Sequence, residues 1–217
     1  LTALGEALLL GGEAARAAER FREILALTRE PGEARRTRLN LARALVPQGR
    51  YAEVIDLVRG LEQAGPLEER SAALFLWGTA LSLEGADLAE AALRLHEAER
   101  LVLAQPAPDP AALAQVRFEL GSVAAQQGDL PRAIAHYREA LAVAEEAAAD
   151  PNTLEGALTW RILARNNLAY HLHLLGDDDA ASRYAAEGLR LAEERGALGL
   201  QPYLRSTSGE IAMARGE

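Results

Sequence analysis

Hydrophobic and small residues recur every three or four positions along almost the whole chain, which is the period of a helix with one buried face. No long β-branched run alternates with polar residues, so the sequence predicts helices and no sheet. The clearest pair of helices lies within Ala112–Ala147, where Gln127-Gly128-Asp129 forms the turn. The predicted helices span residues 1–11, 13–29, 33–47, 51–63, 67–84, 87–104, two segments within 112–147, 152–175, 178–195, and a last segment around Gly209.

One order of small, turn and bulky positions repeats along the chain. After Gly121, a turn glycine follows at the seventh position, a small residue at the twelfth, a bulky one at the sixteenth and a small one at the nineteenth. Small residues let two helices approach closely, and bulky residues fill the space between helix pairs. The equivalent anchors are residues 5, 42, 78, 121, 169 and 209. We therefore predict a single helical-repeat domain over 1–217, with units of about 1–31, 32–66, 67–108, 109–150, 151–197 and a partial unit 198–217.

Prolines and acidic residues mark the expected helix ends. Pro31-Gly32 is the break after the first unit, and Pro47 is expected to distort the last turn of its helix. The segment Gln105–Pro110 is rich in proline and is the best candidate for a bend. Within it, Asp109 is the expected N-cap, with Pro110 at the first helical position.

The repeated register resembles the tetratricopeptide repeat (TPR), whose standard unit has about 34 residues. The anchors here lie 36 to 48 residues apart, so the helices are longer than usual. The long units, Asn166-Asn167-Leu168-Ala169-Tyr170 and the closing segment 208–216 resemble the arrays of MalT-like and antibiotic-regulatory-protein bacterial transcriptional regulators. The resemblance implies an all-α fold, a right-handed α-α superhelix of about five and a half helix pairs, with the first helix of each pair lining a concave groove.

Composition narrows the function classes. Hydrophobic residues make up 49% of the 217 positions, the net charge is −9, and all 23 basic residues are arginine. So acidic a surface disfavours direct nucleic-acid binding. The absence of cysteine excludes disulfides and thiolate metal sites, and no apolar run is long enough for a membrane span. We expect a cytoplasmic location. Because the array begins and ends inside the repeat pattern, we also expect that the chain is a piece of a longer protein, or that a partner covers its last helix.

The register also selects residues that should face the groove. They lie three positions before, one position after and four positions after each anchor, and one helical turn before the first of these positions. Such polar and aromatic groups suit the backbone and side chains of a peptide. The alternative is that they form ordinary solvated helix faces. The candidate binding residues are Arg36, Arg43, Phe75, Thr79, Gln115, Phe118, Ser122, Asn166, Tyr170, His173 and Tyr203.

Other polar clusters favour structural roles. Arg35, Arg36, Arg38 and Arg43 are expected to be neutralised by nearby carboxylates such as Glu30 and Glu33, although the cluster suits a bound carboxylate or phosphate. His171 and His173 point to opposite sides of a helix and cannot share a metal. The acids Asp177, Asp178 and Asp179 open a helix, where they complement its dipole. We predict no metal site, cofactor or catalytic residue.

The sequence thus predicts a non-catalytic scaffold that binds a protein segment, a peptide or another domain of its parent protein. Two alternatives remain open. One is a ligand-sensing module of a regulator, with Phe118, Asn166, Tyr170, His173 and Tyr203 as its pocket. The other is a homo-oligomer formed through the C-terminal helix.

Overall fold

The computed structural model describes residues 2–150 and 153–216. These residues form α-helices, two short 3-10 helices and no strand. The all-α prediction is therefore confirmed. The helices are α1 (Thr2–Leu10), α2 (Ala14–Leu27), α3 (Pro31–Leu45), η1 (Val46–Gln48), α4 (Tyr51–Val58), η2 (Leu61–Gln63), α5 (Leu67–Glu84), α6 (Leu88–Leu103), α7 (Pro110–Gln126), α8 (Leu130–Ala147), α9 (Leu154–Leu174), α10 (Asp178–Glu194) and α11 (Gln201–Arg215).

The chain divides into two compact units, Leu1–Pro108 and Asp109–Glu217. The division falls in the proline-rich segment that the sequence marks as a bend. We call them unit 1 and unit 2. The wider expectation of one domain over 1–217 stays a prediction.

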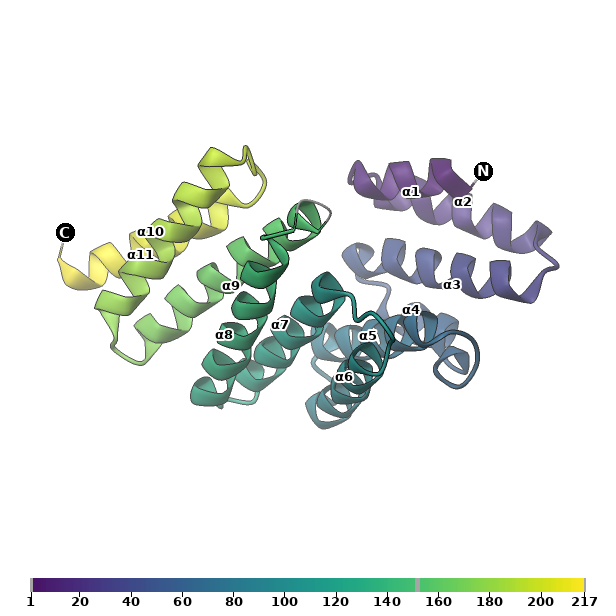
Figure 1. Cartoon of the computed structure of the whole chain (residues 1–217), viewed down its shortest axis with the longest axis horizontal. Helices are drawn as coiled ribbons and strands as arrows, with labels where there is room; N and C mark the ends of the chain where they lie inside the picture. The colour runs from purple at the N-terminus through teal and green to yellow at the C-terminus, as the bar shows by residue number, and fades with distance from the viewer. Residues whose placement is uncertain (1, 151–152, 217) are drawn as a thin grey trace. The chain divides into compact units, whose positions relative to one another are not determined.

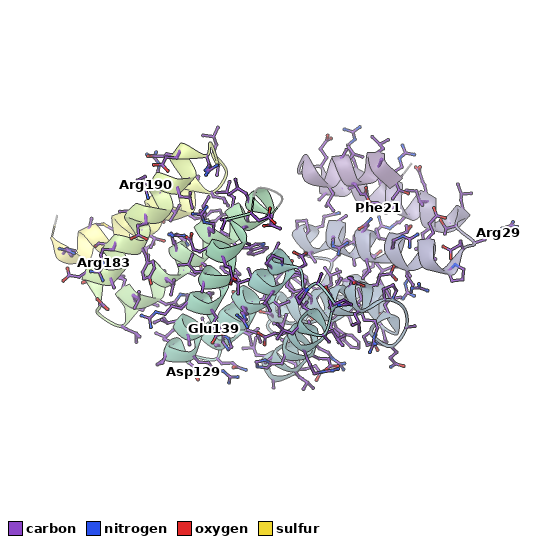
Figure 2. All side chains as sticks on the ribbon, viewed as in Figure 1. Phe21, Arg29, Asp129, Glu139, Arg183 and Arg190 are labelled. Atoms are coloured by element: carbon purple, nitrogen blue, oxygen red, sulfur yellow. The ribbon has the colours of Figure 1, made fainter. Side chains whose placement is uncertain are left out.

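In unit 1, consecutive helices pack against one another from α1 to α6, coloured purple to teal in Figure 1. The core is built from apolar side chains of α2, α3, α4 and α5, and Phe21, Leu45 and Val58 are fully buried. Figure 2 shows Phe21 between the helices and Arg29 projecting outward from the loop after α2. Burial of this apolar surface is the main source of stability for such helices.

In unit 2, α9 is the central element. It packs against α8 and α10, and it also contacts the first helices α7 and α11 (Figure 1). The core contains Tyr137, Leu168 and Ala185, which are buried to at least 98%. The three first helices α7, α9 and α11 therefore lie side by side within one unit.

The predicted pairing of small and bulky residues is confirmed at the glycine anchors. A Cβ atom on Gly121 would lie 2.6 Å from Cε1 of Tyr137, and one on Gly5 would lie 2.7 Å from Cε1 of Phe21. A Cβ on Gly78 would lie 2.7 Å from Cγ of Leu95. In each of these three repeats, the absent side chain of the first helix makes room for the bulky residue of the second helix.

The predicted turn glycines all adopt the left-handed backbone conformation. The φ angles lie between 70° and 81° at Gly12, Gly49, Gly85, Gly128, Gly176 and Gly216. Side chains resist this conformation, which explains why glycine recurs seven residues after each anchor.

The repeat predicted over residues 32–66, which lies in unit 1, departs from the prediction at two places. The helix expected over 51–63 ends at Val58, because Gly60 has a φ of 85° and a 3-10 turn follows at Leu61–Gln63. Pro31-Gly32 is not a break but the first turn of α3, since the Glu30 carboxylate accepts hydrogen bonds from the backbone N–H groups of Gly32 and Glu33. Pro47 distorts its helix as expected, and the last turn becomes the 3-10 helix η1.

Candidate functional site

The first helices of unit 2 carry most of the residues that the sequence selects for binding. Gln115 and Ser122 lie on α7, Tyr170 and His173 on α9, and Tyr203 on α11. The register places them at equivalent positions of adjacent helices. We call these five residues, together with Asn166, the α7–α9–α11 surface.

Tyr170 and His173 are the most chemically defined members of this surface. The Tyr170 ring is 37% exposed and meets the ring of His171 edge-on, with centroids 5.2 Å apart. His173 Nδ1 lies 2.5 Å from Oδ1 of Asp178, the first residue of α10. An ionised carboxylate can only accept, so Nδ1 donates to Asp178 and Nε2 is left for another partner. The surface thus offers an aromatic face and, one turn away, an imidazole held by Asp178.

Asn166 and Ser122 are largely engaged within the protein. Asn166 Oδ1 accepts a hydrogen bond from Thr207 Oγ1 at 3.0 Å, which joins α9 to α11. The Ser122 hydroxyl donates to the carbonyl of Phe118 at 3.3 Å and accepts from the Tyr137 hydroxyl at 3.4 Å. These two residues hold the surface together more than they extend from it. Gln115 is half-buried and Tyr203 is 59% exposed.

Phe118 requires a correction, because it is core and not surface. Only 8% of it is exposed. Its ring lies 5.3 Å from that of Tyr137 and 5.6 Å from that of Trp160, with tilted planes. The cause is Trp160, an α9 residue outside the repeated register, which covers this position. Phe118 therefore contributes to packing, and the pocket expected around it loses its aromatic wall.

The candidates in unit 1 are less consistent with an open surface. Thr79 is buried and its Oγ1 has no hydrogen-bond partner among the described residues, and Phe75 packs half-buried on the core. The expectation that Thr79 faces a groove is therefore corrected in the same way. Arg36 and Arg43 are exposed on α3. A continuous groove through both units stays a prediction.

Two arginines of the α3 cluster are paired with a carboxylate, but not with the one next to them in the sequence. Arg35 Nε lies 2.7 Å from Oε2 of Glu69 on α5, and Arg36 lies 3.7 Å from the same carboxylate. Arg43 donates to Oδ1 of Asn40 at 2.7 Å. Of the carboxylates next in sequence, Glu30 caps α3 instead. No cluster of three metal-ligating side chains occurs among the described residues.

Sequence reasoning missed three polar groups of unit 2. Burial raises the pKa of Glu119 to about 7 and lowers the pKa of His171, whose Nδ1 lies 2.7 Å from the carbonyl of Asn167. As the sequence predicts, Asp178 and Asp179 lie in the first turn of α10, and Asp177 caps it. The feature that the sequence does not predict is that Asp178 also holds His173. The spacing of His173 and Asp178 across the Gly176 turn was the available signal.

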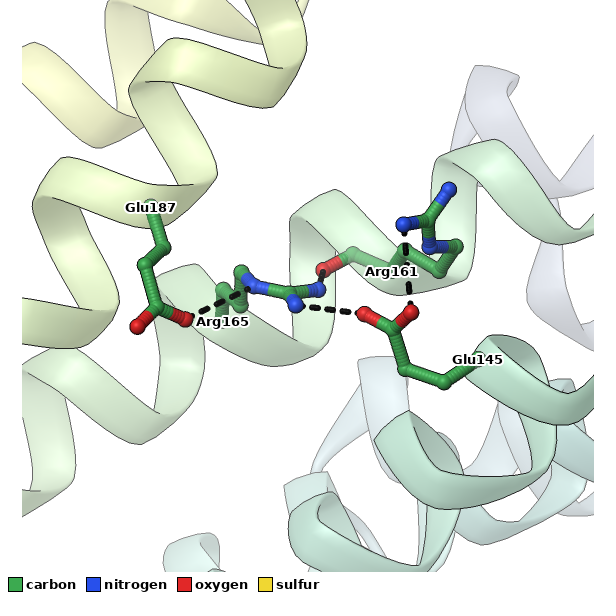
Figure 3. A network of polar contacts seen from close by, with 4 residues as sticks. All are labelled: Glu145, Arg161, Arg165 and Glu187. Carbon is green, nitrogen blue, oxygen red and sulfur yellow. Dashed lines mark hydrogen bonds and ion pairs between the residues drawn. The ribbon is translucent and has the colours of Figure 1, made fainter. Parts of the chain in front are cut away.

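A network of arginines and carboxylates ties α9 to its neighbours on both sides. Arg165 pairs with Glu145 of α8 and, at 3.5 Å, with Glu187 of α10 (Figure 3). Arg161 Nη2 lies 3.1 Å from the same Glu145 carboxylate. The two arginines are 15% and 13% exposed, so the pairs are better shielded from water than ordinary surface ion pairs.

Comparison with known proteins shows the fold class. A family described as a protein of unknown function (DUF2753) matches residues 115–196, which is less than half of the chain. No curated protein matches. Among solved structures, Rap protein in complex with competence and sporulation factor aligns with a TM-score of 0.75 at 15% identity, covering 98% of this chain and 62% of that one.

Two further structures cover most of both chains. The TPR-like repeats of a kinesin light chain from Podosopora anserina align with a TM-score of 0.62 at 16% identity, covering 90% of this chain and 94% of that one. MamA aligns with a TM-score of 0.54 at 16% identity, covering 89% and 96%. The protein therefore has the fold of a TPR-like solenoid of helix pairs.

Among the described residues, no helix is both long and apolar enough to cross a membrane.

Proposed function

We propose that this protein is a non-catalytic interaction scaffold whose α7–α9–α11 surface binds an extended segment of a protein partner. The observation that carries the proposal is that Tyr170 is 37% exposed on α9, one turn before His173, which Asp178 holds in place. Tyrosine is enriched at binding hot spots because a large ring buries much area at little entropic cost. Nε2 of His173 is left to hydrogen-bond a polar group of the bound segment.

The fold supports this proposal without identifying the partner. A TPR-like array presents side chains from several adjacent helices, and unit 2 places three first helices next to one another. The Rap neighbour was solved with a bound factor, which motivates a peptide or protein ligand here as well. A setting inside a larger bacterial regulator, as the resemblance to MalT-like arrays implies, is part of the proposal.

The test is selection of binding peptides from a random displayed library, followed by affinity measurement on variants. Tyr170→Ala should weaken a selected peptide about tenfold or more, the cost of losing a hot-spot ring. Arg183→Ala, at an exposed position of α10 labelled in Figure 2, should leave affinity unchanged. Equal affinity of the two variants would count against the α7–α9–α11 surface. Because Tyr170 is partly exposed, its removal should change the melting temperature little.

A second candidate is self-association through α11. Tyr203 and Met213 are 59% and 73% exposed on this helix, and a Cβ on Gly209 would meet no atom within 4 Å. Exposed apolar side chains of this size beside a small residue are typical of a helix that packs on another. Light scattering coupled to size exclusion tests the idea. A strict monomer at high protein concentration would exclude it.

A further inference from the structure

A cleft of about 500 Å³ lies wholly within unit 1. Its walls come from the 3-10 turn η2 and from the helices α5 and α6. A volume of this size is within the range of known ligand sites. The residues that matter for its chemistry are Glu62, Arg70, Leu74, Leu93, Arg94 and Glu97.

One wall of the cleft is η2, the 3-10 turn that follows the short helix α4. The other second helices have 14 to 18 residues, whereas α4 has 8. Gly60, with its φ of 85°, ends the helix and turns the chain into η2. The register of the repeats would otherwise continue α4 to about residue 63. Gly60 therefore sets the position of the η2 wall of the cleft.

Arg70 presents a positive charge to this cleft. Its Nε donates to the backbone carbonyl of Glu62 at 2.8 Å, which fixes the plane of the guanidinium. It makes no ion pair within 4 Å of a carboxylate among the described residues. The hydrogen bond from Arg100 lowers the pKa of Glu97, and the charge of Arg70 lowers it further. A guanidinium held through Nε keeps its two terminal amino groups for a carboxylate, which it can bind with two parallel hydrogen bonds.

The other charges around the cleft already have partners. Arg94 pairs with Glu90, with Nη2 and Oε1 2.6 Å apart, and its guanidinium stacks 4.2 Å from the centre of the Trp77 ring. Glu97 accepts from Nε of Arg100 at 2.9 Å. Glu62 Oε1 accepts from Nε2 of Gln63 at 3.2 Å, while its Oε2 is buried without a hydrogen-bond donor among the described residues.

Apolar surface completes the site. Leu74 is buried on α5, while Leu93 is 59% exposed on α6, and both line the cleft. An exposed leucine beside an unpaired guanidinium suits a ligand with an aliphatic group next to its carboxylate. The open rim favours a ligand that continues beyond the cleft, as a polypeptide does, over one that is enclosed.

We propose that this cleft binds an acidic-aliphatic segment of a partner polypeptide. The carboxylate of an aspartate or glutamate pairs with Arg70, and the neighbouring aliphatic side chain packs on Leu74 and Leu93. This site is separate from the α7–α9–α11 surface, and neither proposal depends on the other. At about 0.1 M salt the Debye length is near 10 Å, so the net negative charge of the protein is screened while the contact with Arg70 persists.

The probe is the capped tripeptide acetyl-Asp-Leu-Leu-amide, titrated into the whole chain labelled with nitrogen-15. The readout is the indole N–H resonance of Trp77, assigned with a Trp77→Phe variant. We expect saturable shifts with a dissociation constant of about 1 mM, as befits a few contacts. Arg70→Met should weaken binding about tenfold, and Arg29→Met, at an exposed arginine of the same unit, should not. Leu93→Glu, at an exposed position that folding tolerates, should weaken it as well.

Three results would overturn the proposal. The first is equal binding of acetyl-Asn-Leu-Leu-amide, which shows that no carboxylate is recognised. The second is equally tight binding of isovalerate or free leucine, which identifies a small-molecule site. The third is an unchanged Trp77 resonance at saturating peptide, or unchanged affinity in Arg70→Met and Leu93→Glu.

Discussion

Gly121 in α7 and Gly209 in α11 occupy the same register position in different surroundings. A Cβ on Gly121 would overlap the Tyr137 ring, whereas one on Gly209 would point into open space. Gly121→Ala should therefore lower the free energy of unfolding by about 1–2 kcal/mol, because crowding outweighs the gain in helix propensity. Gly209→Ala should raise it by about 0.5–1 kcal/mol. Urea unfolding of both variants measures the contrast, and equal effects would contradict the assigned packing.

Glu119 should make the stability depend on pH. Its folded-state pKa is about 7, above the unfolded value of 4.5, so the folded state binds this proton more tightly. Its contribution is therefore greatest below pH 4.5 and is lost as pH rises to about 7. One pKa unit corresponds to about 1.4 kcal/mol. Because the side chain is only half-buried, water screens part of this effect, and the expected loss of stability is of order 2 kcal/mol.

The measurement is the difference in unfolding free energy between the wild-type protein and Glu119→Gln from pH 4 to 8. The difference isolates Glu119 from His171, whose lowered pKa acts in the opposite sense as pH falls through 6.5. The variant should gain relative to wild type as pH rises. A difference that stays constant across this range would show that Glu119 titrates normally.

For single residues, the sequence predicts the helix face on which a side chain lies better than it predicts whether another helix buries that side chain. The helical period puts Phe118 on the same side of α7 as Ser122, and this is why both were expected in a groove. It does not reveal that Trp160 of α9 lies over Phe118, since Trp160 belongs to no repeated position. Thr79 is buried for reasons of the same kind, which depend on neighbours far along the chain.

Among the helices, α9 should owe part of its position to Arg165. This side chain contacts carboxylates on α8 and α10, and it is only 13% exposed (Figure 3). A double-mutant cycle of Glu145→Gln and Arg165→Gln should give a coupling of about 1 kcal/mol, more than an open surface pair. The matched control is the exposed Arg190–Glu194 pair on α10, where we expect about 0.5 kcal/mol or less. Equal couplings would remove the special role of Arg165.

Helix ends divide into those that sequence chemistry specifies and those it does not. The left-handed turn glycines and the Asp109 cap with Pro110 are local signals, and the structure confirms them. The early end of α4 was missed, because the hydrophobic pattern continues through Leu61 while Gly60 interrupts the backbone. The 3-10 turn after this break forms one wall of the cleft in unit 1, so the proposed further site belongs to the least regular repeat.

For the molecule as a whole, the two compact units predict separable folding. Each has its own buried cluster, around Phe21 and Leu45 in unit 1 and around Tyr137 and Leu168 in unit 2. Fragments 1–108 and 109–217 should each be helical by circular dichroism and unfold cooperatively in urea. Each should have a smaller m-value than the intact chain, because less surface is exposed on unfolding. A fragment that is a random coil would mean that its core depends on the other unit.

The repeat register and the fold class follow from the sequence because small and bulky residues recur at fixed spacing. The identity of the partner does not follow from the sequence, because it depends on which side chains remain exposed in the folded protein.

The most direct test of the scaffold proposal is an amide chemical-shift map of the intact labelled protein with a library-selected peptide. We predict shifts concentrated on α7, α9 and α11, around Tyr170 and His173, that become clearly smaller in Tyr170→Ala at the same subsaturating peptide concentration. Shifts confined to the second helices α8 and α10, or to unit 1, would contradict the assignment of the α7–α9–α11 surface.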